Sequence, residues 1–268
     1  MNNKIWMGMV LSIILVSGCA LTPGVSTGGK TPAGTVPLIA KFSKSPVVID
    51  GKLDDPVWKI SPAYNLSLAK SNLLPLAKRQ DKREGIDILR DEGIAQLAWD
   101  ENYLYIGIKF YDSDIVQEGT EDQKHFYGTG DLVEIFLKPE GNTWYWEIYG
   151  TPNEKKTVFW FPGRGRIGIP SSFQPGMELQ DILVAAQVKG TLNDWKDRDE
   201  YWTLEMAIPV KGLTQYGDAF GPGSKWRILI ARYNYSRYNP WTELSTAPQL
   251  SIANFHLLEG YGALIFER

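Results

Sequence analysis

The sequence predicts an all-β fold, an antiparallel β-sandwich or jelly roll, formed by a single domain that follows a signal and a tether. Residues 103–111 alternate between aliphatic side chains and aromatic or polar ones, the period of two that is typical of a strand with one buried face. Other short apolar segments follow at close spacing and are separated by turn signals such as Pro222-Gly223-Ser224. Because no long helical pattern interrupts them, we expect these strands to pack as two sheets.

Strand patterns recur through most of the chain. We expect strands at residues 95–99, 103–111, 132–138, 143–149, 156–161, 182–189, 201–208, 226–235 and 263–266. Residues 209–213 are expected to form a short helical turn. Residues 66–93 contain the mixed-charge run 78–84, and we interpret this segment as a solvated insert with at most a short helix.

The N-terminus predicts a lipoprotein signal. An apolar run of about 12 residues follows Lys4, which is too short for a membrane span of about 20 residues. Ser17 and Gly18 precede Cys19, so we expect residues 1–18 to be a signal peptide and Cys19 to be lipidated. Residues 19–37 are rich in Gly, Thr, Pro and Ser, which predicts a flexible tether before a domain at 38–268. The expected location is the bacterial cell envelope, at the outer membrane or the cell surface, through this lipid anchor.

Composition narrows the function classes. The chain has 268 residues and a net charge of −3, and a mildly acidic protein lacks the basic face that nucleic acid requires. Its single cysteine allows no disulfide within the chain, so stability must come from packing in what we expect to be a monomer. Its 10 Trp and 13 Tyr suit stacking against sugar rings, although β-sandwiches also favour aromatic residues in their strands.

Five segments in order carry the most informative pattern. They are residues 48–58 with an Asp-Gly turn and Trp58, then 97–106, 131–137, 205–209 and 255–266. Over roughly residues 46–266 the chain resembles the carbohydrate-binding module family 9-like domains. The resemblance implies a non-catalytic β-sandwich that binds an oligo- or polysaccharide and needs no cofactor, although family members often hold structural calcium. It also implies that Trp58 and Trp99 are buried anchors.

The resemblance further implies a sugar site. In the family, two aromatic rings hold the end of a sugar chain and a strand glutamate hydrogen-bonds its hydroxyl groups. The matching positions are Tyr127 (or Phe126), Phe255 and Glu134. Both family rings are normally Trp, so this chain has smaller rings. The family's polar partners on the strand around residues 228–232 are amides, and in this chain Arg232 and Asn234 are the residues that could serve in their place.

The residues themselves leave alternatives open. Glu134 lies on an apolar strand face, where a carboxylate needs a partner, either Arg232 or Arg227 or the hydroxyl groups of a sugar. Glu147, between Tyr145 and Tyr149, is open to the same two interpretations.

Loop aromatic residues complete the expected site. Tyr127 lies in a loop with two glycines and Trp241 in a loop with a proline, and loops often carry binding residues. The predicted ligand-binding set is therefore Tyr127, Glu134, Arg232, Trp241 and Phe255, at one end of the sandwich.

The sequence also leaves open one metal site and two other function classes. Asp112 and Asp114 end a strand and could hold Ca²⁺, or simply form a turn. A glycoside hydrolase acting on O-glycosyl bonds would need two facing carboxylates, and the sequence singles out no catalytic pair. A b-type haem electron-transfer sandwich would have to draw its ligands from the available histidines and methionines, namely His125, His256, Met177 and Met206.

Overall fold

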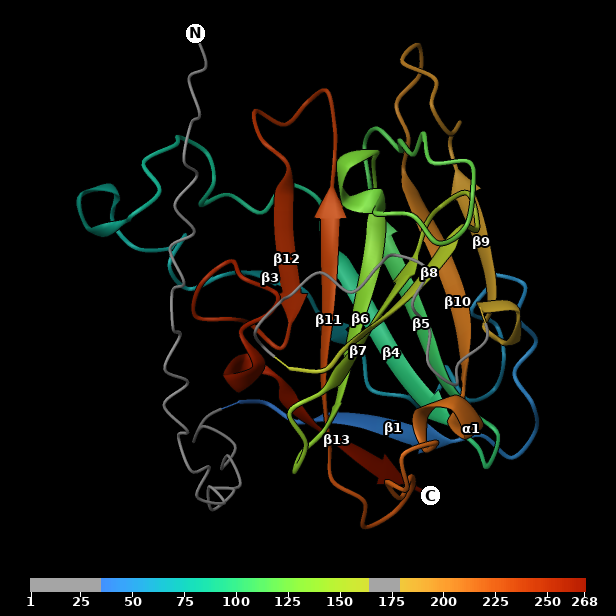
Figure 1. The fold of residues 1–268 in the computed structure, drawn as a ribbon. Coiled ribbons are helices and arrows are strands. Elements are labelled where there is room, and N and C mark those ends of the chain that lie inside the picture. Colours follow the sequence, from blue (N-terminus) through green and yellow to red (C-terminus); the bar gives the residue numbers. More distant parts are fainter. Residues whose placement is uncertain (1–34, 164–178) are drawn as a thin grey trace, which may run out of the picture.

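The fold is a β-sandwich, as predicted. The computed structural model describes residues 35–163 and 179–268, and in them thirteen strands form one hydrogen-bonded sheet that folds back on itself as two packed layers (Figure 1). The predicted signal peptide, Cys19 and most of the tether lie outside the described residues, as does Met177. No helix within the described ranges is long and apolar enough to cross a membrane.

One layer contains the strands that prove important for the candidate site. It has the order β8-β7-β6-β11, with β12 paired to β11 and β3 paired to β12. These strands are β6 (Leu132–Pro139), β7 (Tyr145–Gly150), β8 (Lys156–Phe161), β11 (Trp226–Asn234), β12 (Glu243–Ala247) and β3 (Ser67–Leu68).

The second layer packs behind the first. Its order is β4-β5-β10-β9, with β2 paired to the edge of β4. The strands are β2 (Tyr64–Asn65), β4 (Gly93–Trp99), β5 (Tyr103–Tyr111), β9 (Leu183–Lys189) and β10 (Tyr201–Pro209). Short helical turns connect the strands: η1 (Leu76–Lys78), η2 (Phe126–Gly128), η3 (Leu179–Asp181), α1 (Val210–Leu213) and η4 (Leu258–Gly260).

Two strands join the layers at one end. β1 (Leu38–Phe42) and β13 (Gly262–Glu267) cross below the other strands in Figure 1. β1 pairs in parallel with both β13 and β4, whereas the other strand pairs in the described ranges are antiparallel. The sandwich is therefore antiparallel except around β1.

The core lies between the layers and follows from the period-two pattern. Val133, Ile135 and Leu137 of β6 pack into the main core, together with residues of β4, β5 and β10. Phe136 belongs to a second apolar cluster with Phe255 and Tyr261, on the opposite face of the same layer. Glu134 shares that outer face with Phe136 because successive strand residues point to opposite sides.

The opening motif and the motif at residues 205–209 form one structural unit. The buried carboxylate of Glu205 on β10 accepts hydrogen bonds from the backbone N–H of Asp50 at 3.0 Å, that of Gly51 at 2.8 Å, and Trp58 Nε1 at 2.8 Å. Gly51 has a φ of +79°, and a Cβ there would lie 2.8 Å from the Ala186 carbonyl carbon, so this turn requires glycine.

The two predicted anchors are confirmed. Trp58 is 4% exposed and packs on the outer face of the second layer, and Trp99 is 3% exposed within the main core.

The predicted strands agree with the structure to within two residues at each end. The predicted helical turn is α1. The sequence prediction missed β1, β2, β3 and β12. β2 and β3 have only two residues each, and β12 carries Ser and Thr where a strand pattern would show apolar residues.

Candidate functional site

A pocket of about 350 Å³ opens on the outer face of the first layer. Its floor is made by Glu134 of β6, Glu147 and Tyr149 of β7, and Tyr233 of β11. The remaining lining residues are His125, Tyr127, Phe161, Leu244, Ala253, Asn254, Phe255 and His256. The pocket thus lies on the outer face of this layer, where Glu134, Tyr149 and Tyr233 are each within two residues of an end of their strand.

Aromatic rings line this pocket. Tyr127 is 45% exposed, and its ring centroid lies 6.1 Å from that of Tyr233. Phe255 meets Tyr233 edge-on, with centroids 5.3 Å apart, and is largely buried. The structure therefore brings Tyr127, Phe255 and Glu134 together at one pocket, three of the five residues in the predicted set.

The two glutamates of the floor are almost completely buried. Glu134 is 2% exposed and Glu147 is 4% exposed. The Tyr149 hydroxyl donates a hydrogen bond to Glu147 Oε1. Glu147 Oε2 accepts no hydrogen bond from the described residues, and His256 Nε2 lies 4.0 Å from it. The Tyr145 hydroxyl and His256 Nδ1 are 2.8 Å apart and share a hydrogen bond.

Burial is the largest effect on the pKa values of Glu134 and Glu147. Desolvation raises the pKa of Glu147 to about 7, against a partial lowering by the Tyr149 hydrogen bond. Desolvation also raises the pKa of Glu134 well above its usual value, and the nearby charge of Glu147 raises it further. The pair is therefore costly to ionise while the pocket is empty of compensating charge.

Arg232 does not belong to this pocket, and its predicted role is corrected. In the pairing of β11 with β6, Ala231 lies opposite Glu134 and Arg232 opposite Val133, so Arg232 points to the other face of the sheet. It is fully buried, and its Nη2 donates to Asp112 Oδ2 at 3.0 Å and to the Tyr111 carbonyl oxygen at 2.8 Å. The structure therefore contradicts its assignment as a sugar contact.

The same geometry corrects the alternative ion pairs for Glu134. Arg232 is on the wrong face, and Arg227 instead pairs with Glu140, with Nη2 and Oε1 2.9 Å apart. Neither arginine compensates the charge of Glu134.

The carboxylates expected to hold calcium have arginine partners. Asp112 pairs with Arg232, and Asp114 Oδ1 accepts from Arg237 Nη1 at 2.7 Å. Burial, the largest effect, raises the pKa of Asp112 to about 6 although Arg232 opposes this. No group of three or more His, Cys, Asp or Glu side chains suited to a metal occurs in the described part of the chain. Asp112 and Asp114 therefore neutralise arginines, and the geometry gives no support to calcium between them.

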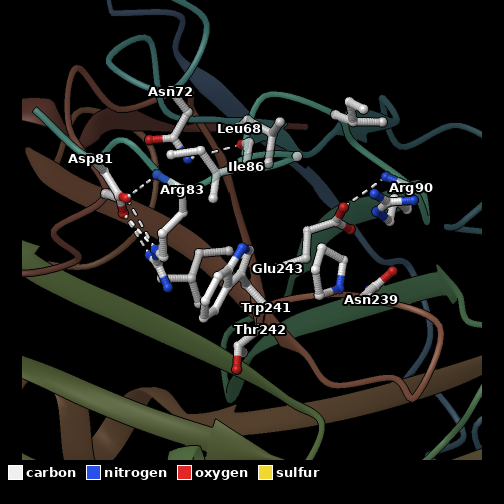
Figure 2. A pocket seen from close by; sticks show the side chains of 15 residues that line it. Leu68, Asn72, Asp81, Arg83, Ile86, Arg90, Asn239, Trp241, Thr242 and Glu243 are labelled. Atoms are coloured by element: carbon white, nitrogen blue, oxygen red, sulfur yellow. Dashed lines mark hydrogen bonds and ion pairs between the residues drawn. The ribbon is translucent and has the colours of Figure 1, made fainter. Parts of the chain in front are cut away.

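Trp241 lies in a second, smaller pocket (Figure 2). This pocket of about 60 Å³ forms between the insert that follows β3 and the loop before β12. The Arg83 guanidinium lies 4.8 Å from the Trp241 ring centroid, and Trp241 Nε1 donates to the Glu84 carbonyl oxygen at 3.2 Å. Leu244 and Ala253 line both pockets, so the two are neighbours. The structure does not bring Trp241 into contact with Tyr127 or Glu134.

The predicted set omitted several lining residues. Tyr149 follows Glu147 by two residues on the same strand face, so the period-two pattern could have found Tyr149. Tyr233 likewise shares the β11 face of Ala231, opposite Glu134. The loop contributions of Ala253 and Asn254 carried no sequence signal, because loop packing has no periodicity.

Comparison with known proteins identifies the family. The model of the carbohydrate family 9 binding domain-like proteins matches residues 49–221, well over half of the chain. The chain belongs to this family. The family match contains Tyr127, Glu134 and Glu147 and ends within the segment before β11. No curated protein matches the chain.

Solved structures share the fold of this family 9 domain. A Bacteroides uniformis protein proposed to bind carbohydrate has a TM-score of 0.62 at 14% identity, covering 86% of this chain and 98% of that one. A family 9 carbohydrate-binding module from Caldicellulosiruptor kristjanssonii in complex with cellotriose has a TM-score of 0.55 at 14% identity, over 87% and 94%. The same organism's module with glucose has a TM-score of 0.53 at 14% identity, over 86% and 96%.

Proposed function

We propose that this family 9 domain binds an oligo- or polysaccharide in the pocket above Glu134 and Glu147, without cleaving it. We further propose that Cys19 anchors it by lipid to the bacterial cell envelope, where it captures polysaccharide for degradation. The observation that carries the binding proposal is the pocket itself, in which aromatic rings surround buried carboxylates with spare hydrogen-bonding capacity. Family membership and the sugar complexes of the Caldicellulosiruptor kristjanssonii module support it.

The chemistry of the pocket suits a sugar. Its volume of about 350 Å³ lies at the lower end of the ligand pockets of proteins, about 300–1,000 Å³. Tyr127, which is 45% exposed, offers a flat apolar surface to the C–H groups of a sugar ring, and the largely buried Phe255 lines the pocket beside Tyr233. Carboxylates accept charge-assisted hydrogen bonds from hydroxyl groups, which are roughly twice as strong as neutral ones. Ring stacking and carboxylate hydrogen bonds together would hold the end of a sugar chain in the pocket.

The acidic pair makes hydrolysis the second candidate, because a glycosidase also uses two carboxyl groups. Hydrolysis needs the two groups to flank the scissile bond. Here Glu134 is directly opposite Tyr149 and Phe136 is opposite Glu147, so the two glutamates are diagonal neighbours on one sheet face. Both therefore lie on the same side of the pocket, whereas hydrolysis needs the two groups on either side of the scissile bond. Release of reducing ends from a polysaccharide panel distinguishes the two candidates.

A glycan array tests the binding proposal. The full chain, purified in detergent, should bind a defined set of glycans, and Tyr127→Ala should weaken that binding about tenfold, the equivalent of about 1.4 kcal/mol. Tyr216→Ala is the matched control, because Tyr216 is 46% exposed against 45% for Tyr127 and lines neither pocket. Equal losses in both variants, or no glycan bound by the unaltered chain, would contradict the proposal.

A further inference from the structure

We infer that the ligand of this pocket is a positively charged amino sugar, whose ammonium group lies between Glu134 and Glu147. The inference rests on the proposed function and narrows its ligand class. It is drawn from the charge balance of the pocket, from the unsatisfied carboxylate oxygen in its floor and from its aromatic walls.

The described lining of the pocket holds two carboxyl groups and no permanent positive charge that would compensate them when they ionise. Glu134 and Glu147 are both buried, and none of the described residues that line the pocket is Lys or Arg. The other titratable groups that face the pair are tyrosines or histidines: Tyr149 on β7, Tyr233 on β11, Tyr127 and His125 from one loop, and His256 from another. His256 is the nearest of the groups that can become cationic, at 4.0 Å from Glu147 Oε2, beyond hydrogen-bond distance.

Other buried carboxylates of the described chain have hydrogen-bond donors or arginine partners. Asp112 has Arg232, and Glu205 has three N–H donors. Asp131 accepts from the backbone N–H groups of Val116 and Tyr235, both at 2.7 Å. Glu243 accepts from the Arg90 backbone N–H at 2.7 Å and from Asn234 Nδ2 at 3.2 Å. Against this pattern, Glu147 Oε2 is a buried carboxylate oxygen that receives no hydrogen bond from the described residues.

An ammonium group is the donor that completes this site. Sugar hydroxyl groups could donate hydrogen bonds to the glutamates, but they carry no charge and so cannot offset the cost of ionising two neighbouring buried carboxyl groups. An ammonium carries three N–H donors and one positive charge, so it can bind both carboxylates and offset their repulsion.

The aromatic walls point to the same ligand. Tyr127, Tyr233 and Phe255 surround the pocket, and aromatic rings attract cations through their π faces. Burial raises the pKa of both glutamates, and no cation of the described pocket lowers either value.

Calorimetric titration at pH 7 with three disaccharides tests the inference. The probes are the β-1,4 disaccharides of glucosamine, of N-acetylglucosamine and of glucose, which share a backbone but of which only the first is charged. The full chain in detergent should bind the glucosamine disaccharide at least tenfold more tightly than either neutral sugar. This preference should decrease as salt is added, because charge attraction is screened.

Glu→Gln variants test the charge of the glutamates, because they remove it while keeping the shape of the side chain. Glu147→Gln should weaken binding of the glucosamine disaccharide at least tenfold and change binding of the neutral sugars less than threefold. Glu101→Gln, an exposed carboxylate outside the pocket, should leave all affinities unchanged. If Glu147→Gln does not fold, Glu134→Gln and the ligand comparison on the unaltered chain still provide the test.

The outcomes distinguish the inference from the function beneath it. Equal or tighter binding of a neutral disaccharide would overturn the amino-sugar inference and leave sugar binding intact. Binding of no sugar, here and on the glycan array, would overturn both.

Discussion

Replacing Glu147 by Gln should stabilise the protein at neutral and alkaline pH. The substitution keeps the size of the side chain and an acceptor for the Tyr149 hydroxyl, but it removes a buried charge. Glu147 is 4% exposed, and burial raises its pKa from 4.5 to about 7. Each pKa unit is worth about 1.4 kcal/mol, so ionising this group in the folded chain costs up to about 3 kcal/mol of unfolding free energy.

The sign of the pH dependence follows from this shift. The folded state holds its proton up to a higher pH than the unfolded state does. The stabilising contribution is therefore fully present below about pH 4.5 and is lost as pH rises through about 7. Glu134 adds to the same trend, because its pKa is also raised by burial and by Glu147. The Gln variant should be flatter over this range and melt about 6–12 °C higher at pH 8 than the unaltered chain.

Thermal unfolding followed by circular dichroism from pH 5 to pH 9 measures this difference. Glu101→Gln is the control for loss of a negative charge, since that carboxylate is 64% exposed. If Glu147→Gln were less stable than the unaltered chain at pH 8, or kept the same pH slope, a compensating positive charge must face Glu147. That result would refute the charge balance from which the ligand class was inferred.

Three further changes probe the fold and the anchor. Arg232→Ala should cost about 3–5 kcal/mol by leaving Asp112 buried and unpaired, measured by urea unfolding, and should leave sugar affinity unchanged in the folded fraction; a selective loss of affinity would restore Arg232 to the site. Trp58→Ala should cost about 3–5 kcal/mol, and a melting temperature equal to that of the unaltered chain would contradict its role as an anchor. Cys19→Ala should leave an unprocessed or soluble precursor in detergent partitioning, whereas identical aqueous partitioning of both forms would exclude lipidation.

The sequence predicts the parts of the fold that depend on local pattern. Alternation in residues 103–111 and 132–138 gives both the strands and the face of each residue, so the outward direction of Glu134 was predictable. The resemblance placed Tyr127 and Phe255 at the same site as Glu134, and the structure brings the three together at one pocket. Each of these residues lies at a fixed distance along the sequence from a strand or a motif, so its place could be predicted from sequence spacing.

The rest depends on which strands become neighbours. Arg232 resembled a ligand contact because it lies near the expected strand position, but the register of β11 against β6 turns it into the core beside Asp112. Trp241 resembled a site aromatic because its loop could present it, yet the insert after β3 supplies Arg83 and a separate pocket. Register and insert packing are set by contacts between distant segments, and a single sequence carries no record of them.

A crystal structure of the full chain with the disaccharide that binds most tightly tests the central claim most directly. We expect the sugar ring between Tyr127 and Phe255, with a ligand nitrogen or oxygen within about 3.2 Å of a carboxylate oxygen of both Glu134 and Glu147. A sugar bound beside Trp241 in the smaller pocket, or on the outer face of the second layer, would contradict the assignment of the site.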